Sequence, residues 1–164
     1  AEDSLRMVSE LMQALPQAES LSDFFVNLLD KILGATSADL GYILSLSGRS
    51  LSVAAGHDHF DEDIRIKPGK VLCLPLIDRA LKNQQPVLID QVYRDPEAAA
   101  LLESCGFSCQ SVGIFPFLAP DGRKGALYLL NPEICDSSSV LLIQPFLNLI
   151  PVSYLQFQSA VPTT

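Results

Sequence analysis

The sequence has 164 residues, 48% of them hydrophobic and 18% charged. This length is typical of one domain, and the composition excludes a disordered chain. No apolar run approaches the roughly 18 residues that span a bilayer, so we expect a soluble protein without a membrane segment. The 19 acidic and 11 basic residues give a formal net charge of -8. That charge repels phosphate backbones, so a nucleic-acid partner is not expected.

The cysteines bear on the cellular compartment. Cys73, Cys105, Cys109 and Cys135 form neither a paired CxxC zinc pattern nor the dense framework of a secreted disulfide protein. We therefore expect a reducing, cytoplasmic compartment. The chain shows no signal peptide and begins at Ala1 without an initiating methionine, so we expect a piece of a longer protein.

Two helices are predicted at the start of the chain. Apolar residues from Leu5 to Leu15 recur at helical spacing until Pro16. We assign residues 1–16 to a helix that packs across its own domain or pairs with a second copy. A wider stripe follows in residues 21–33, where Gly34 is expected to end a core helix in the left-handed conformation.

The apolar period then changes from 3.6 to 2. Residues 38–55 predict a hairpin that turns at residues 47–49, and an acidic loop, GHDHFDED, follows it. A third helix carries an apolar stripe from Cys73 to Leu81. A short strand then ends at Asp90, and a short helix begins at the Asp95 cap and ends near Gly106.

The central feature is residues 111–132, SVGIFPFLAPDGRKGALYLLNP. A Pro-Asp-Gly cluster between two alternating runs predicts a hairpin in the middle of an antiparallel sheet. Both faces of the first run are apolar, so both should be covered. Pro116 cannot donate to a strand ladder, which predicts a bulge or a local edge there.

An apolar segment closes the chain. It begins at caps in residues 136–139 and runs to about Gln158. Pro145 and Pro151 are expected to kink or interrupt this helix, and residues 159–164 are expected to be a frayed tail.

Three stretches of this sequence resemble the GAF domain family, the small sensory modules of signalling proteins. They are ADLGYIL, IKPGKVL and the run from QPVLIDQVYRDPEAAALL to the central hairpin. The resemblance covers roughly residues 20–158, so we assign residues 17–158 to a GAF-like domain. It implies an α/β (α+β) fold with an antiparallel sheet of five or six strands, helices packed on one face and a ligand pocket on the other.

The resemblance also implies a function. The domain would be a non-catalytic sensor that binds a small molecule and changes the activity of an attached output domain, in a homodimer formed through its helical face. The cofactor or ligand is left open. By position, the wall of the pocket would include Tyr42, Asp90, Tyr93, Ser111, Gly113, Phe115 and Phe117. From the alternation we expect Phe115 and Phe117 on the face away from the helices.

A thiol enzyme is the alternative. One enzymatic branch resembling GAF, the free methionine sulfoxide reductases, uses a nucleophilic cysteine and a resolving cysteine at positions that Cys105 and Cys73 nearly occupy. The sequence departs from that branch, because Val112 replaces one expected carboxylate. Residues 129–131, Leu-Leu-Asn, replace the others. Cys73 also lies on an apolar stripe, where a thiol is more often an inert core residue.

Other chemistries fit less well. His57 and His59, with the acidic residues around them, could bind a metal, but a solvated acidic loop explains them better, and no metal site is predicted. The Cys-His pair of bilin-binding members and the Asn-Lys pair of cyclic-nucleotide-binding members are absent. Lys67 and Lys70 give a weak anion-site signal. A ligandless dimerisation module is the remaining alternative.

Overall fold

The structure, a computed structural model, describes residues 2–58, 72–106 and 109–159. Five α-helices, five strands and the two short 3-10 turns η1 and η3 lie in these ranges. The helices are α1 Glu2–Ala14, α2 Leu21–Thr36, α3 Leu74–Asn83, α4 Pro96–Ser104 and α5 Ser137–Ser159. The strands are β1 Leu40–Ser47, β2 Ser50–Asp58, β3 Val87–Ile89, β4 Val112–Leu118 and β5 Lys124–Leu130. The 3-10 turns are η1 Leu15–Gln17 and η3 Val92–Arg94.

The strands form one antiparallel sheet in the order β2-β1-β5-β4-β3. The predicted hairpin of β4 and β5 is confirmed, and β5 is the central strand. Pro116 pairs opposite Ala126 of β5, while the pairing of β4 with β3 ends at Ile114. Pro116 therefore lies on a local edge of the sheet, where a missing N–H is tolerated.

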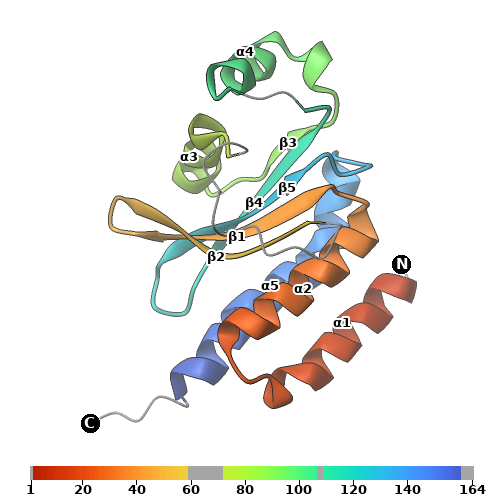
Figure 1. Ribbon diagram of the computed structural model, residues 1–164, viewed down its shortest axis with the longest axis vertical. Helices are drawn as coiled ribbons and strands as arrows, with labels where there is room; N and C mark the ends of the chain where they lie inside the picture. The colour runs from red at the N-terminus through yellow and green to blue at the C-terminus, as the bar shows by residue number, and fades with distance from the viewer. Residues whose placement is uncertain (1, 59–71, 107–108, 160–164) are drawn as a thin grey trace.

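Helices α2 and α5 cover one face of this sheet, and α1 packs on them. Figure 1 shows α1, α2 and α5 side by side on one side, with α3 and α4 on the other. Ser20 caps α2 by accepting a hydrogen bond from the backbone N–H of Asp23 at 3.1 Å. The expected stop at Gly34 is wrong: the helix continues to Thr36, and Ser37 takes the left-handed conformation with φ 56°.

The placement of Phe115 and Phe117 corrects the sequence-based expectation. Both rings belong to the hydrophobic cluster formed with α1, α2 and α5, not to the opposite face. A Cβ atom on Gly113 would lie 3.0 Å from the Phe115 ring, and one on Gly125 would lie 2.3 Å from the Phe117 ring. These glycines therefore leave the space that the rings occupy. The alternation of β4 was correct, but both of its faces are apolar, and the pattern did not say which face meets the large helices.

The second face of the sheet is covered by α3 and α4. The face is lined by a separate hydrophobic cluster that includes Tyr42, Val112, Ile114 and Tyr128. Helix α3 packs directly on β3, β4 and β5, whereas α4 packs on η3 (Figure 1). The face expected to hold the ligand pocket is therefore covered by two short helices.

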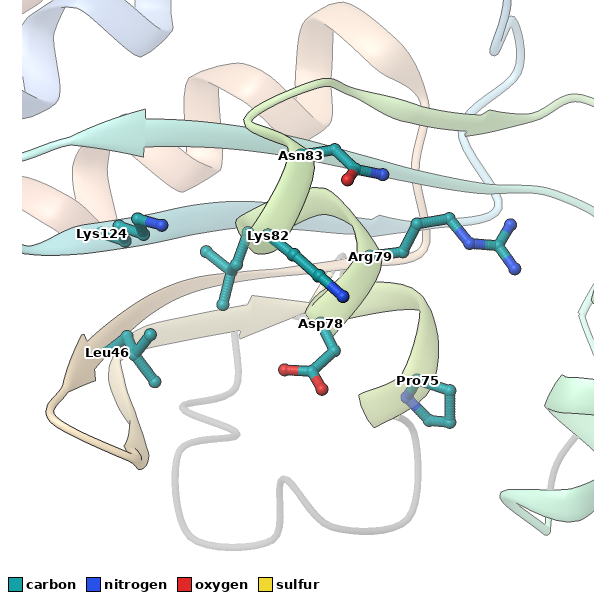
Figure 2. Close-up of a pocket in the computed structure, with 8 residues that line it drawn as sticks. Leu46, Pro75, Asp78, Arg79, Lys82, Asn83 and Lys124 are labelled. Carbon is teal, nitrogen blue, oxygen red and sulfur yellow. The ribbon is translucent and has the colours of Figure 1, made fainter.

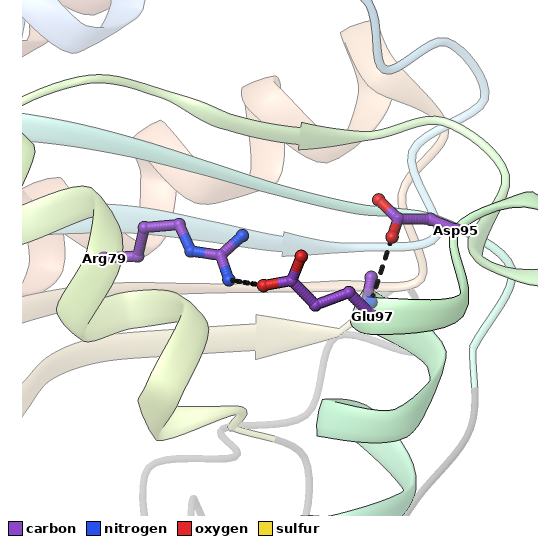
Figure 3. A network of polar contacts seen from close by, with 4 residues as sticks. Arg79, Asp95 and Glu97 are labelled. Atoms are coloured by element: carbon purple, nitrogen blue, oxygen red, sulfur yellow. Dashed lines mark hydrogen bonds and ion pairs between the residues drawn. The ribbon is translucent and has the colours of Figure 1, made fainter.

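An ion pair and a cap order this layer. The Arg79 guanidinium of α3 donates to the Glu97 carboxylate of α4 at 2.8 Å (Figure 3). Asp95 caps α4 by accepting a hydrogen bond from the backbone N–H of Ala98 at 3.1 Å. The predicted start of this helix is thus confirmed, with Pro96 in its first turn.

Helix α5 runs unbroken through Pro145 and Pro151, so the expected interruption is absent. Its residues Ser137–Phe157 are long and apolar enough, by length and composition alone, to cross a membrane. This was not foreseen from the sequence. Phe146 and Ile150 are nevertheless fully buried in the cluster with α1 and α2, as in the core helix of a globular domain.

Part of the predicted acidic loop is a strand. His57 and Asp58 belong to β2, and His57 is buried, with its Nε2 atom 3.5 Å from the Asp30 carboxylate of α2. The other predicted residues of that region, His59 to Lys70, lie outside the described residues.

Candidate functional site

Two cysteine thiols meet on the face covered by α3 and α4. Cys73 is the residue directly before α3, and Cys105 directly follows α4. Their sulfur atoms lie 3.3 Å apart, with the Cys105 thiol donating to the Cys73 sulfur. Cys73 is completely buried, while Cys105 is only partly buried. The pair that the resemblance implied for a thiol enzyme is thus brought together. Cys73 occupies the N-cap position of α3 without a side-chain capping bond, and it is buried in the same cluster as Leu76 and Ile77 of the predicted stripe.

Tyr128 of β5 lies beside this thiol pair. Its phenol oxygen accepts a hydrogen bond from the backbone N–H of Cys73 at 3.3 Å. Tyr42 of β1 is its direct partner across the sheet, and both tyrosines are buried. Burial is the largest cause that raises the pKa of each phenol, so both are neutral at physiological pH. The sequence analysis missed Tyr128, although it alternates with Ala126 and Leu130 on this face.

The thiols of Cys73 and Cys109 are poorly solvated. Burial, followed by the hydrogen bond with Cys105, raises the pKa of Cys73 to about 12. Burial raises the pKa of Cys109 to about 11. Because only a thiolate is an effective nucleophile, neither of these two thiols is activated at neutral pH.

A surface groove of about 700 Å³ lies between η3 and α4. Cys109 lines this groove and also lies near Tyr128. The walls of the groove are mostly apolar, and Glu103 is the one charged residue among the described lining residues. Tyr93, which is 74% exposed, stands at its edge. The groove is lined by Val92, Tyr93, Ala99, Leu102, Glu103, Gly106 and Cys109.

A second groove, of about 540 Å³, lies between α3 and the ends of β1 and β5 (Figure 2). Its lining carries the cations Arg79, Lys82 and Lys124 and the carboxylate of Asp78. Figure 2 shows Asp78, Arg79 and Lys82 on α3, with the Arg79 side chain directed away from the other two, and Lys124 on the neighbouring strand β5. Arg79 is also engaged by Glu97. This groove therefore has the character of a solvated surface.

The seven predicted ligand residues are not gathered in one place. Tyr42 lies under α3 and α4, and Tyr93 borders the groove, whereas Gly113, Phe115 and Phe117 face the opposite helices. Asp90 and Ser111 are fixed by local bonds. The Asp90 carboxylate accepts from the backbone N–H of Cys135 at 3.3 Å. The Ser111 hydroxyl donates to the carbonyl oxygen of Pro132 at 2.8 Å.

The residues that replace the expected carboxylates have structural contacts. Val112 and Leu130 are buried beneath α3 and α4, and Leu129 is buried on the opposite face. The Asn131 side chain accepts from the backbone N–H groups of Gln110 and Ser111 at 2.8 and 3.2 Å. These residues thus offer packing and chain support rather than a counter-charge for an amino group.

The described residues contain no group of three or more His, Cys, Asp and Glu side chains arranged to hold a metal ion. Of His57 and His59, only His57 lies among the described residues. It belongs to the edge strand β2 and contacts the Asp30 carboxylate of α2.

No protein-family model matches the sequence, and no curated protein matches it. Solved structures do match. The GAF domain of an Acinetobacter phosphoenolpyruvate-protein phosphotransferase superposes with a TM-score of 0.67 at 13% identity, covering 96% of each chain. This chain has a GAF fold.

Two further structures show how widely this fold is used. The free methionine-R-sulfoxide reductase of Neisseria meningitidis, solved with its substrate, matches with a TM-score of 0.70 at 13% identity, over 96% of this chain and 92% of that one. The N-acylhomoserine lactone dependent transcription factor CepR2 of Burkholderia cenocepacia matches with a TM-score of 0.67 at 17% identity, over 98% and 100%. Similar folds thus occur in the GAF domain of a phosphotransferase, in an enzyme and in a transcription factor.

Proposed function

We propose that this GAF-fold chain is a small-molecule-binding regulatory domain of a larger signalling protein. The observation that carries the proposal is the groove between η3 and α4. It opens beside a helical layer that contacts the sheet mainly through α3, so α4 can shift without disturbing the main core. A ligand that prefers one position of α4 would shift the population of that state.

The groove limits the chemistry of the ligand. Val92, Leu102 and Ala99 supply an apolar wall, and Glu103 supplies a hydrogen-bond acceptor with a negative charge. These walls suit a small molecule with an apolar body and a donor or cationic group. An anionic metabolite would meet the Glu103 carboxylate and the chain's net charge of -8.

The direct test compares two tryptophan substitutions in α4. Ala99 lines the groove, whereas its neighbour Ala100 is exposed outside it. Native mass spectrometry of the purified protein, followed by denaturing release, would identify a retained molecule. For a protein that retains none, melting-temperature shifts with amines and amino acids are the probe, and nucleotides and 2-oxo acids serve as the anionic comparison. We expect binding in the wild type and in Ala100→Trp, and its loss in Ala99→Trp. Binding that survives in both variants would contradict this site, and no binding under any condition would favour a ligandless dimerisation module.

The regulatory proposal includes a homodimer. Apolar side chains remain exposed on one stripe of α1, Leu5 and Met12, and on one stripe of α5, Leu141, Val152 and Leu155. Covering such stripes is a common reason for self-association. Light scattering should give a dimer mass that Leu155→Glu lowers and Leu118→Glu, on the β4–β5 hairpin, leaves unchanged. A monomeric mass over a wide concentration range would contradict the dimer.

A thiol reductase is the second candidate, favoured by the 3.3 Å contact of Cys73 with Cys105. The fold match to a free methionine-R-sulfoxide reductase adds to it. It ranks second because apolar Val112, Leu129 and Leu130 stand where carboxylates would hold a free amino acid.

A further inference from the structure

The Cys73–Cys105 contact joins the ends of two antiparallel helices. Cys73 stands at the N-terminal end of α3, and Cys105 stands at the C-terminal end of α4. At the other end of α4, Glu97 binds Arg79 of α3 at 2.8 Å (Figure 3). The two helices are therefore linked at both ends of α4, by an exposed ion pair at one end and by two thiols at the other.

The two thiols differ in access. Cys73 has no exposed surface, whereas Cys105 is partly exposed, so a dissolved oxidant meets Cys105 first. The sulfur atoms are 3.3 Å apart. A disulfide bond is about 2.05 Å long, so the sulfurs need to approach by only about 1.3 Å to form one.

We propose that Cys73 and Cys105 form a reversible oxidation site for a peroxide, and that the resulting disulfide fixes α4 on α3 and so sets the shape of the adjacent groove. The effect on the groove rests on the proposed binding function, while the disulfide itself does not. No sulfoxide substrate is involved.

The oxidation consumes two thiols and one hydrogen peroxide and gives one disulfide and two waters. The Cys105 sulfur attacks one peroxide oxygen, the O–O bond breaks, and the other oxygen leaves as water, which gives a sulfenic acid. The Cys73 sulfur then attacks the Cys105 sulfur. The S–S bond forms, the S–O bond breaks, and the hydroxyl leaves as a second water with the Cys73 proton. The two sulfurs together lose two electrons, and an added dithiol returns them by exchange.

The position of Cys105 connects the disulfide to the groove. Gly106, the next residue, lines the groove, as does Leu102 one turn earlier in α4. With the thiols reduced, this end of α4 is held by packing and a weak sulfur contact. With the disulfide formed, it is held covalently to the start of α3, whose N–H at Cys73 is bonded to Tyr128 of the sheet.

The test treats the purified chain with hydrogen peroxide and maps disulfides by mass spectrometry of unreduced peptides. We expect a Cys73–Cys105 linkage that dithiothreitol reverses, and a melting temperature raised by about 5–10 °C. Cys105→Ser should abolish both the linkage and the rise. Cys109→Ser and Cys135→Ser are the matched controls and should keep both. Because Cys73 is fully buried, its substitution can prevent folding, so Cys73→Ala and Cys73→Ser are both made. If neither variant folds, Cys105→Ser at the partly exposed position tests the proposal.

Three results would overturn the proposal: a Cys105–Cys109 linkage, sulfinic acid at Cys105 without a disulfide, or a disulfide that leaves the melting temperature unchanged. The binding proposal fails separately. If the linkage forms but neither the reduced nor the oxidised protein binds any molecule, the oxidation site stands and the binding function falls. If the reduced protein binds a molecule but no linkage forms, the reverse holds.

Discussion

The two faces of the sheet are built from alternate residues of the same strands, yet they differ in kind. On one face Phe115 and Phe117 fill the space over Gly113 and Gly125 and belong to one hydrophobic cluster with residues of α1, α2 and α5. On the other face Tyr128 supports a pair of thiols beneath two short helices, next to an open groove. The first face is a close-packed core, and the second holds the thiol pair and borders the groove. Stability and function can thus be separated by substitutions at neighbouring positions.

The largest effect is expected from Phe115→Ala. The ring is 2% exposed and packed in the larger cluster, so its removal should cost about 3–5 kcal/mol of unfolding free energy in denaturant titrations. Tyr93→Ala is the control on the other side, because Tyr93 is 74% exposed, and a change within about 0.5 kcal/mol is expected. A loss below about 1 kcal/mol for Phe115→Ala would show that this face is not the core.

Gly125→Ala should cost about 1–3 kcal/mol or more. Its Cβ would lie 2.3 Å from the Phe117 ring and 2.6 Å from the carbonyl oxygen of Leu44, which is backbone and cannot rotate away. In α2, Gly34 has open space around its Cβ position, so Gly34→Ala should stabilise the protein by about 0.5–1 kcal/mol. Equal effects of the two substitutions in thermal unfolding would contradict the packing described for β5.

Alkaline pH should weaken the face that carries the thiols. The folded-state pKa of Cys73 is raised to about 12, so the folded protein keeps a proton that the unfolded chain releases near pH 9. The stability linked to this group is complete below pH 9 and is lost as the pH rises towards 12. Cys73→Ala should reduce the slope of unfolding free energy against pH in that window, and an unchanged slope would contradict a buried, protonated Cys73.

The smallest effect is expected from Arg79→Ala. The Arg79 and Glu97 side chains are 41% and 75% exposed, so their ion pair should contribute about 0–1 kcal/mol. Glu97→Gln should have a similar effect, and the double variant should cost little more than either single one. A loss above about 2 kcal/mol in denaturant titrations would mean that this pair, rather than packing, holds α4 in place.

Local patterns in the sequence predicted much of the fold. The change of period from 3.6 to 2, the Pro-Asp-Gly turn and the Asp95-Pro96 start placed the hairpins and α4 correctly, because these signals act between near neighbours. The same signals could not assign the faces of β4, since Val112 and Ile114 are as apolar as Phe115 and Phe117. They also favoured Gly34 as the helix end, although the backbone turns at Ser37.

The candidate site was predictable only in part. Cys73 and Cys105 were paired through the resemblance to one enzymatic branch, and their 32-residue separation gave no local signal of contact. Tyr128 was missed because its hydrogen bond to Cys73 spans 55 residues and depends on how α3 sits on the sheet. The ligand residues that were inferred by position lie on both faces of the sheet for the same reason. Tertiary packing, and not local sequence, sets which helices cover each face.

An assay of reductase turnover tests the central claim most directly. The purified chain is incubated with free L-methionine-R-sulfoxide and an excess of dithiothreitol, and the methionine formed is measured over many equivalents of protein. A regulatory domain without counter-charges for the substrate predicts no more methionine than the Cys105→Ser variant gives. Turnover that Cys105→Ser and Cys73→Ala both abolish, and that Cys109→Ser retains, would contradict a non-catalytic domain and make the thiol pair an active site.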